Sequence, residues 1–247
     1  MENVDDDSKF IPLKSKYLQL REIVRGKIEE GEYLPGMAIP SENKLAETFG
    51  INRLTVRNAV EALVNEGLLQ RVQGKGVFVV GEKYEDVLEE YGGFVSSLTP
   101  KSKRVSIKEQ SKTLRYAGDK YANLFDIELD DFIFDIRHLN YLDDDPISYE
   151  QIFVPKDVLP QLEDVNSSVF SMMDLFTFYN IEVCSMRQSL DLQPVGDPKI
   201  RKRLEVPGNI ALIMMEVNYR DQHGRVIELS RSFIRSDKCS FRINMHE

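Results

Sequence analysis

Apolar residues near the start of the chain recur at the spacing of an α-helix. Segment 13–30 places an apolar side chain every three or four positions, at Tyr17, Leu20, Val24 and Ile28. This spacing puts the side chains on one helical face, so the segment is predicted to be a first helix that ends near Gly31. The prolines and glycine of the following LPGMAIP stretch then break the chain.

Two shorter helical patterns follow, each bounded by residues that favour helix ends. Ser41 suits the N-cap of a second helix that ends at Gly50, and Asn52 suits the N-cap of a third that ends at Gly67. The buried stripe of the third helix is expected to comprise Val56, Ala59, Val60 and Leu63. Two short helices joined by a tight turn predict a helix-turn-helix, whose second helix can enter the major groove of DNA.

An extended pattern directly after the third helix predicts a β-hairpin. Strands are expected at 68–72 and 77–80, and the connecting QGKG carries glycines suited to a tight turn. A basic hairpin at this place is typical of a wing. Its tip at Gly74, Lys75 and Gly76 is expected to meet the phosphate backbone or a minor groove.

The start of the third helix carries two arginines on its exposed side. Arg53 and Arg57 lie one turn apart with Thr55 between them, whereas Val56 points inward. An arginine there can reach guanine or grip a phosphate, and a threonine suits a phosphate oxygen or a thymine methyl group. A solvated charged surface is the alternative interpretation of the same residues.

Beyond residue 81 the chain changes from helical to strand-like patterns. A hairpin is expected from 131–142 and 146–154 across an acidic turn, and a longer one within 209–237 that turns at His223 and Gly224.

Helical and extended segments separate these two hairpins. Helical spacing occurs within 166–180, segment 181–195 is extended, and 197–206 is a short helix with Asp197 as N-cap and Pro198 at its first position. The polar stretch 81–98 is interpreted as a linker plus a first helix. Together these patterns predict an α+β domain with an antiparallel sheet.

Composition and charge exclude several classes of protein. Cys184 and Cys239 are far apart without metal-ligand spacing, so buried structural thiols are expected rather than a disulfide framework or a zinc site. The chain has no apolar run long enough for a membrane span, and its acidic start is unlike a signal peptide, so a cytoplasmic protein is expected. No metal or other cofactor is expected. The net charge is −9, yet residues 9–80 have more basic than acidic residues. A basic head on an acidic body suits a polyanion-binding module joined to a second function.

Residues 10–80 resemble the winged helix-turn-helix of GntR-type bacterial transcription regulators. The likeness is carried by IPSENKLAETFGINRLTVRNAVEALVNEGLLQRVQGKGVFV. It implies a set of residues that contact double-stranded operator DNA, namely Asn43, Asn52, Arg53, Thr55, Arg57, Gln73, Gly74 and Lys75. Many members have arginine where this chain has Asn43, and asparagine favours adenine over guanine.

The end of the chain resembles the UTRA effector domain of the HutC-like branch, whose fold is similar to chorismate lyase. The matching stretch is LEVPGNIALIMMEVNYRDQHGRVIELSRSFIRSDKCSFRI. We therefore expect a disordered acidic tail at 1–9, the DNA-binding domain at 10–80, the linker and first helix at 81–98, and an effector and dimerisation domain at 99–247. The resemblance implies a homodimeric repressor whose operator affinity responds to a small molecule.

Strand alternation and the resemblance together nominate an effector site. Alternation places Glu228, Ser230 and Ser232 on one strand face, where they can bind sugar hydroxyls or an amine; a solvent-facing surface is the alternative. The resemblance adds Ser148 and Glu150 on the earlier hairpin. Further candidates for an anion are Ser167 and Ser168 at an expected helix start, where plain N-capping is the alternative, and the backbone amides of Gly92 and Gly93.

The expected phosphate-binding arginines are missing from this site. Members thought to bind phosphosugars show Arg-x-Arg ahead of the first hairpin turn, whereas His138 and Asn140 stand in those places and Arg137 is one residue away. A phosphate would therefore lack its bidentate partners. His138 as an ordinary edge-strand histidine is the alternative. A sugar or sugar phosphate is the favoured effector, an amino acid or related carboxylate the second candidate, and a body that only dimerises the third.

An enzyme is the competing class for a body of this fold. The sequence has no nucleophile elbow, HExxH motif or Walker loop, and its three histidines are scattered. No catalytic residue is expected, and the sequence favours a regulator.

Overall fold

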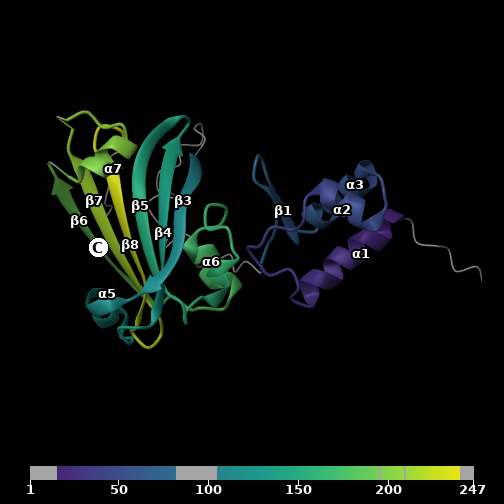
Figure 1. Ribbon diagram of the computed structural model, residues 1–247, viewed down its shortest axis with the longest axis horizontal. Coiled ribbons are helices and arrows are strands. Elements are labelled where there is room, and N and C mark those ends of the chain that lie inside the picture. Colours follow the sequence, from purple (N-terminus) through teal and green to yellow (C-terminus); the bar gives the residue numbers. More distant parts are fainter. Residues whose placement is uncertain (1–15, 82–104, 195, 209, 240–247) are drawn as a thin grey trace, which may run out of the picture. The chain divides into compact units, whose positions relative to one another are not determined.

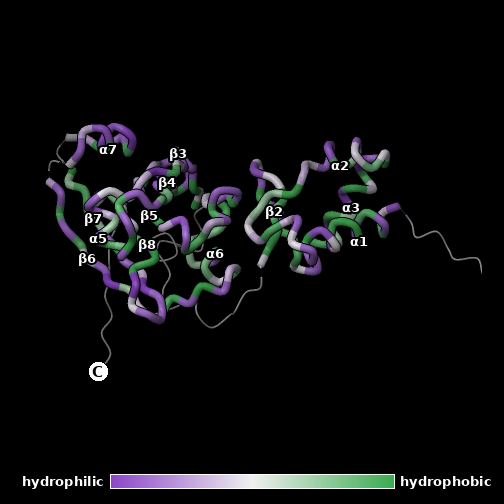
Figure 2. The backbone as a smooth tube through the Cα atoms, turned by 60° about the horizontal axis from the view of Figure 1, so that its bottom comes forward, coloured by the Kyte–Doolittle hydropathy of each residue, from purple (hydrophilic) through white to green (hydrophobic). Residues whose placement is uncertain are grey.

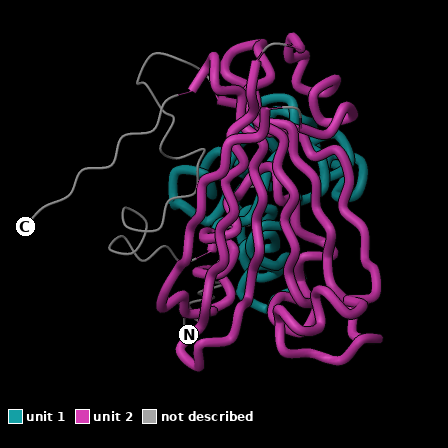
Figure 3. Tube along the Cα trace, turned by 90° about the vertical axis from the view of Figure 1, so that its left-hand side faces the viewer, with its two compact units in different colours: residues 1–80 teal, residues 81–247 magenta. Residues whose placement is uncertain are grey.

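The computed structural model describes residues 16–81, 105–194, 196–208 and 210–239. The chain forms two compact units, Met1–Val80 and Gly81–Glu247, referred to below as the head and the body (Figure 3). Among the described helices, none has the length and apolar character needed to cross a membrane. The expected segment 1–9 lies outside the described residues, as does all of the expected segment 81–98 except Gly81.

The head contains the three helices and the hairpin predicted from the sequence (Figure 1). The elements are α1 (Lys16–Glu29), α2 (Glu42–Phe49), α3 (Arg53–Asn65), β1 (Leu69–Val72) and β2 (Gly76–Val79). One core joins α1, through Leu20 and Val24, to α3, through Val56, Val60 and Leu63. The hydrophobic segments of α1 and α3 are visible in Figure 2.

The helix ends of the head follow the capping residues. The Ser41 hydroxyl accepts a hydrogen bond from the Lys44 N–H at 3.3 Å, and Gly50 ends α2 in the left-handed conformation with φ of 59°. Asn52 is the N-cap of α3, and its side chain accepts a hydrogen bond from the Thr55 N–H. The helix-turn-helix prediction is therefore confirmed.

The segment before α2 pairs with strand β2 of the hairpin. Met37 and Ile39 exchange backbone hydrogen bonds with Val77 and Val79 of β2, including Ile39 N–H to Val77 O at 2.9 Å. This pairing anchors the hairpin to the head core. This pairing was not predicted from the sequence, because the prolines and glycine of the LPGMAIP stretch are typical of turns.

The body is built on a six-stranded antiparallel sheet with strand order β3-β4-β5-β8-β7-β6 (Figure 1). Its strands are β3 (Val105–Tyr116), β4 (Phe132–Leu142), β5 (Asp145–Pro155), β6 (Ser185–Gln193), β7 (Leu212–Arg220) and β8 (Val226–Arg235). Both hairpins and the strand at β6 were predicted. The α+β class with an antiparallel sheet is confirmed.

Short helices cover one face of this sheet at its two ends. They are α5 (Gly118–Phe125), which packs Tyr121 and Phe125 onto Phe153 and Leu229, and α7 (Pro198–Arg203), which packs Ile200 near Tyr149. A 3-10 turn η1 (Pro160–Glu163) and α6 (Met172–Phe178) complete the body. The cap of α7 by Asp197 was predicted and is confirmed, with the Lys199 N–H donating at 2.7 Å.

One expectation about the body is wrong, and one alternative interpretation is excluded. Cys184 is exposed rather than buried, because it immediately precedes the edge strand β6. The strand surface around Glu228 is not solvent-facing, because β8 lies between β5 and β7 and is buried on both faces.

Candidate functional sites

The N-terminus of α3 is fixed by Asn52 and Thr55. The side-chain oxygen of Asn52 accepts hydrogen bonds from the backbone N–H of Thr55 at 2.8 Å and from its hydroxyl at 3.0 Å. Both residues were predicted to contact DNA. The Asn52 oxygen already accepts these two capping bonds, and this cap holds the first turn of α3 in place.

Glu42 connects the recognition helix to the wing, which comprises residues 69–79. Its carboxylate accepts from Arg53 Nε at 3.4 Å and from Arg71 Nη1 at 2.7 Å. The hydrogen bond from Arg71, followed by that from Arg53, holds the pKa of Glu42 below its ordinary value. Sequence reasoning did not identify Glu42 or Arg71, because their partners lie eleven and 29 residues apart.

The remaining residues predicted to contact DNA are exposed in the head. They are Asn43, Arg57, Gln73, Gly74 and Lys75. The wing turn depends on glycine at two positions, since Gly74 and Gly76 have φ of 75° and 128°. Leu54, next to Arg53, is 68% exposed, so the start of α3 also presents an apolar side chain suited to a thymine methyl group.

The body gathers most of the predicted effector residues on the sheet face opposite α5 and α7. His138 pairs with Glu150 across β4 and β5, Asn140 pairs with Ser148, and Glu150 pairs with Ser232 of β8. Residues at alternate positions of a strand share a face, so Glu228 and Ser230 belong with Ser232. We refer to this set as the polar cluster, which contains His138, Asn140, Ser148, Glu150, Glu228, Ser230 and Ser232.

Hydrogen bonds link the polar cluster to the loop before α6. The Ser167 hydroxyl lies 2.9 Å from Nε2 of His138 and donates to Glu109 at 2.7 Å. Asn140 Nδ2 donates to the Ser148 hydroxyl at 3.0 Å. His138 is 2% exposed on an inner strand, so it is not an edge-strand residue.

The two glutamates of the cluster have perturbed acidity. Burial raises the pKa of Glu228 well above its ordinary value, and the nearby Glu150 carboxylate raises it further. Burial also raises the pKa of Glu150, whereas hydrogen bonds from Asn140 and Ser232 partly oppose that rise. Oε2 of Glu228 and Oδ1 of Asn140 are buried and accept no hydrogen bond.

One predicted effector residue is placed elsewhere, and two others are not described. Arg137 lies on the opposite sheet face, where its guanidinium donates to Asp135 at 3.1 Å and 3.3 Å, because adjacent strand residues point to opposite sides. Gly92 and Gly93 lie outside the described residues.

The anion site expected at Ser167 and Ser168 is corrected by the start of α6. That helix begins at Met172, after Ser171, which forms a capping box with Asp174. Ser167 and Ser168 therefore precede the helix, and the Ser168 hydroxyl bonds Asn166 at 2.7 Å. The aligned N–H groups assumed for anion binding are not at these two serines.

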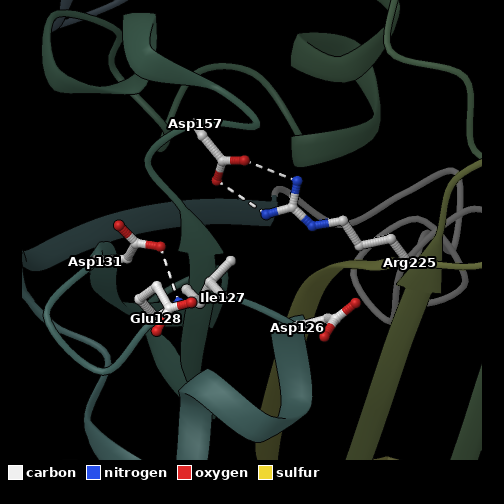
Figure 4. A pocket seen from close by; sticks show the side chains of 6 residues that line it. All are labelled: Asp126, Ile127, Glu128, Asp131, Asp157 and Arg225. Carbon is white, nitrogen blue, oxygen red and sulfur yellow. Dashed lines mark hydrogen bonds and ion pairs between the residues drawn. The ribbon is translucent and has the colours of Figure 1, made fainter.

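A separate open depression of about 430 Å³ lies near the turn between β7 and β8 (Figure 4). Its lining is mainly acidic, with Asp126, Glu128 and Asp131, and Arg225 binds Asp157 through two hydrogen bonds of 2.7 Å and 3.0 Å. It contains no residue of the polar cluster. Across the described ranges, no group of three or more His, Cys, Asp or Glu side chains could hold a metal ion.

Comparison with known families matches both units. Residues 16–79 match the family described as "Bacterial regulatory proteins, gntR family", and residues 101–240 match the "UTRA domain". The two matches cover the DNA-binding and effector-binding parts expected from the sequence.

Relatives of similar length extend the match over nearly the whole chain. The transcriptional repressor NagR of Bacillus subtilis is 28% identical over 91% of this chain and 92% of its own. A probable fructoselysine utilization operon transcriptional repressor of Shigella flexneri is 26% identical over 92% and 93%. The crystal structure of PhnF from Mycobacterium smegmatis shares the fold, with a TM-score of 0.59 at 18% identity over 93% of this chain and 98% of that one. The chain therefore belongs to the GntR family of bacterial regulatory proteins, as a DNA-binding transcriptional repressor with a UTRA effector-binding domain and not as an enzyme.

Proposed function

We propose that the polar cluster of the body binds a small-molecule effector that controls how tightly the head binds its operator. The observation that carries this proposal is the pair of buried acceptors, Glu228 Oε2 and Asn140 Oδ1, neither of which accepts a hydrogen bond. Buried polar atoms in native proteins are nearly always paired, so a ligand is the expected source of the missing donors.

Operator contact is assigned to the start of α3 and to the wing. Arg53, held by Glu42, and the exposed Arg57 are positioned to read base edges or grip phosphates. Gln73, Gly74 and Lys75 at the wing tip are assigned to contacts with the phosphate backbone of the DNA. Asn43 is assigned to a base that favours an amide, such as adenine.

The effector class is assigned to sugar derivatives. One relative is named as a probable repressor of a fructoselysine utilization operon, and fructoselysine is a sugar derivative. A simple carboxylate is a poorer candidate, because a further negative charge beside Glu150 and Glu228 would disfavour their ionised forms, which burial already disfavours.

The protein is assigned as a homodimer. One helix-turn-helix reads one half-site, so a two-fold operator needs two heads. Strand β6 is the surface assigned to the contact: among the described strands it pairs with β7 alone, and its exposed side chains include Met186, Leu190 and Leu192. An edge strand with apolar side chains readily pairs with another chain.

The experiment combines operator selection with effector release. A randomised duplex pool is selected on the full chain, and affinity for the recovered duplex is measured by fluorescence anisotropy with and without each sugar derivative. A compound that binds the protein should lower operator affinity, and Ser232→Ala should weaken the response without changing affinity in the absence of compound. If compounds bind and leave operator affinity unchanged, the regulatory role of the cluster is wrong.

A further inference from the structure

The polar cluster contains acceptors without donors, and they are deeply buried. Glu228 is 3% exposed and Asn140 is 0% exposed, yet Glu228 Oε2 and Asn140 Oδ1 accept no hydrogen bond. Leaving a buried acceptor unpaired is unfavourable, because the group has lost its hydrogen bonds to water. Two such atoms on one sheet face indicate a ligand that donates hydrogen bonds at both places.

The ionisable groups around these acceptors are mainly carboxyl groups. Glu109, Glu150 and Glu228 all lie on this face, because Glu109 pairs with His138 and Glu150 pairs with Ser232. Lys112 shares the face, but its ammonium donates to three backbone carbonyls, of Leu162, Glu163 and Val165, at 2.9 Å, 3.0 Å and 2.7 Å. The Lys112 ammonium therefore binds the loop after β5 and does not supply a donor to the polar cluster.

Arginine is likewise engaged elsewhere. Arg137 lies on the opposite face with Asp135, and Arg231 lies there too, where it donates to Glu216 at 2.6 Å. Within residues 105–239 that the structure describes, no guanidinium faces the polar cluster. A phosphate would therefore find none of the bidentate donors that usually hold it.

Resting on the effector role proposed above, we infer that the effector is an unphosphorylated compound whose ammonium group binds Glu228 and whose hydroxyl or second N–H group donates to Oδ1 of Asn140. An ammonium has several donors and no acceptor, which matches an unpaired carboxylate oxygen. The hydroxyls of Ser148 and Ser230, which share this face, are placed for further ligand hydroxyl groups.

The acidity of the cluster agrees with this geometry. Burial and the Glu150 carboxylate both raise the pKa of Glu228, which means that its ionised form is unfavourable in the empty protein. A cation beside the carboxylate offsets both effects. A site that binds anions through basic side chains would instead repel a cationic ligand.

The first test is a thermal-melt comparison of the full chain with matched compounds. Glucosamine is compared with glucose, and both are compared with their 6-phosphates. Each amine should raise the melting temperature more than its alcohol partner, and each phosphate should bind no better than its unphosphorylated parent. Glu228→Gln should weaken amine binding by about 30-fold or more. The matched control Glu216→Gln, on the opposite face, should leave binding unchanged.

The second test needs no knowledge of the natural effector. Ser230→Lys places an ammonium next to Glu228, and Ser230→Met is its uncharged control of similar length. The lysine variant should melt above the methionine variant in the wild-type background and below it when combined with Glu228→Gln.

The outcomes separate this inference from the regulatory proposal. A phosphorylated or neutral compound that binds best and releases operator would support the regulator while overturning the ammonium assignment. Amines that behave like their alcohols, or a Ser230→Lys variant that gains nothing from Glu228, would overturn it as well. Amines that bind tightly without changing operator affinity would support the ligand class and contradict the regulatory role.

Discussion

Arg53 Nε at the start of α3 lies 3.4 Å from Oε2 of Glu42 at the start of α2. The same carboxylate binds Arg71 of the wing, so one side chain connects both DNA-facing elements. Arg53, the proposed recognition arginine, is therefore positioned by Glu42 in the absence of DNA. Since Glu42 is negative, it also opposes phosphate in general, and the two effects can be separated experimentally.

Glu42→Gln is expected to lower operator specificity rather than total DNA affinity. Loss of the carboxylate frees Arg53 from its position, which weakens operator binding by up to about 1 kcal/mol, as for an exposed ion pair. Loss of a negative charge also strengthens binding to any duplex. Anisotropy on operator and scrambled duplexes should show a smaller ratio of the two affinities. An unchanged ratio would mean that Arg53 needs no positioning.

Arg53→Ala and Arg57→Ala are each expected to cost about 1–3 kcal/mol of operator binding and to leave the melting temperature unchanged. Both side chains are exposed at the start of α3, and neither packs in the head core. Lys156→Ala, in the body, is the charge-matched control and should bind operator normally. Normal operator affinity in both arginine variants would refute the assignment of α3 as the recognition helix.

Asn52→Ala is expected to destabilise the head by about 1 kcal/mol, because α3 loses its N-cap. Asn52→Asp keeps the acceptor and should retain most of that stability. Chemical denaturation of the full chain, followed by a probe in the head, measures both. A variant that loses operator affinity at unchanged stability would show that Asn52 acts only as a DNA contact.

The stability of the body should depend on pH through Glu228. Burial raises its pKa in the folded state above the ordinary value of 4.5, so the folded protein retains this proton when the unfolded chain has lost it. Stability therefore falls as pH rises above the unfolded pKa, until the folded pKa is passed. Relative to wild type, Glu228→Gln should become progressively more stable as the pH rises above the ordinary value of 4.5. A constant difference over that range would contradict a raised pKa.

Leu190→Lys combined with Leu192→Lys is expected to shift the protein from dimer to monomer. The two leucines are 40% and 65% exposed on the edge strand β6, and lysines on an edge oppose pairing with another chain. Light scattering after size exclusion measures the mass. Leu114→Lys on β3, the edge strand at the other end of the sheet, is the control, and a dimer that depends on it instead would relocate the interface.

Local signals in the sequence were sufficient where the structure depends on neighbouring residues. Ser41, Asn52 and Asp197 cap the helices they were expected to cap, and the hairpin turn near Gly224 follows from local composition. Strand β3 was not predicted, because its residues alternate weakly and most of its side chains are at least partly exposed.

Contacts between segments that are distant in the sequence were not predicted. Ser167 was associated with a helix start, whereas its partners are His138, 29 residues away, and Glu109, 58 residues away. Alternation along β8 correctly grouped Glu228, Ser230 and Ser232 on one face. The same rule separates Arg137 from His138, but only the strand register shows which of the two faces the cluster.

The position of β8 in the middle of the sheet has a consequence for engineering a biosensor. Its even-numbered residues 228, 230 and 232 lie in the polar cluster, whereas Leu229 packs beneath α5 on the other face. Under the proposed effector role of the cluster, a combinatorial library confined to the even positions would change which compound is detected while leaving the hydrophobic layer intact. Compensating mutations in the DNA-reading unit would not be needed, and one reporter promoter would serve every sensor selected from the library.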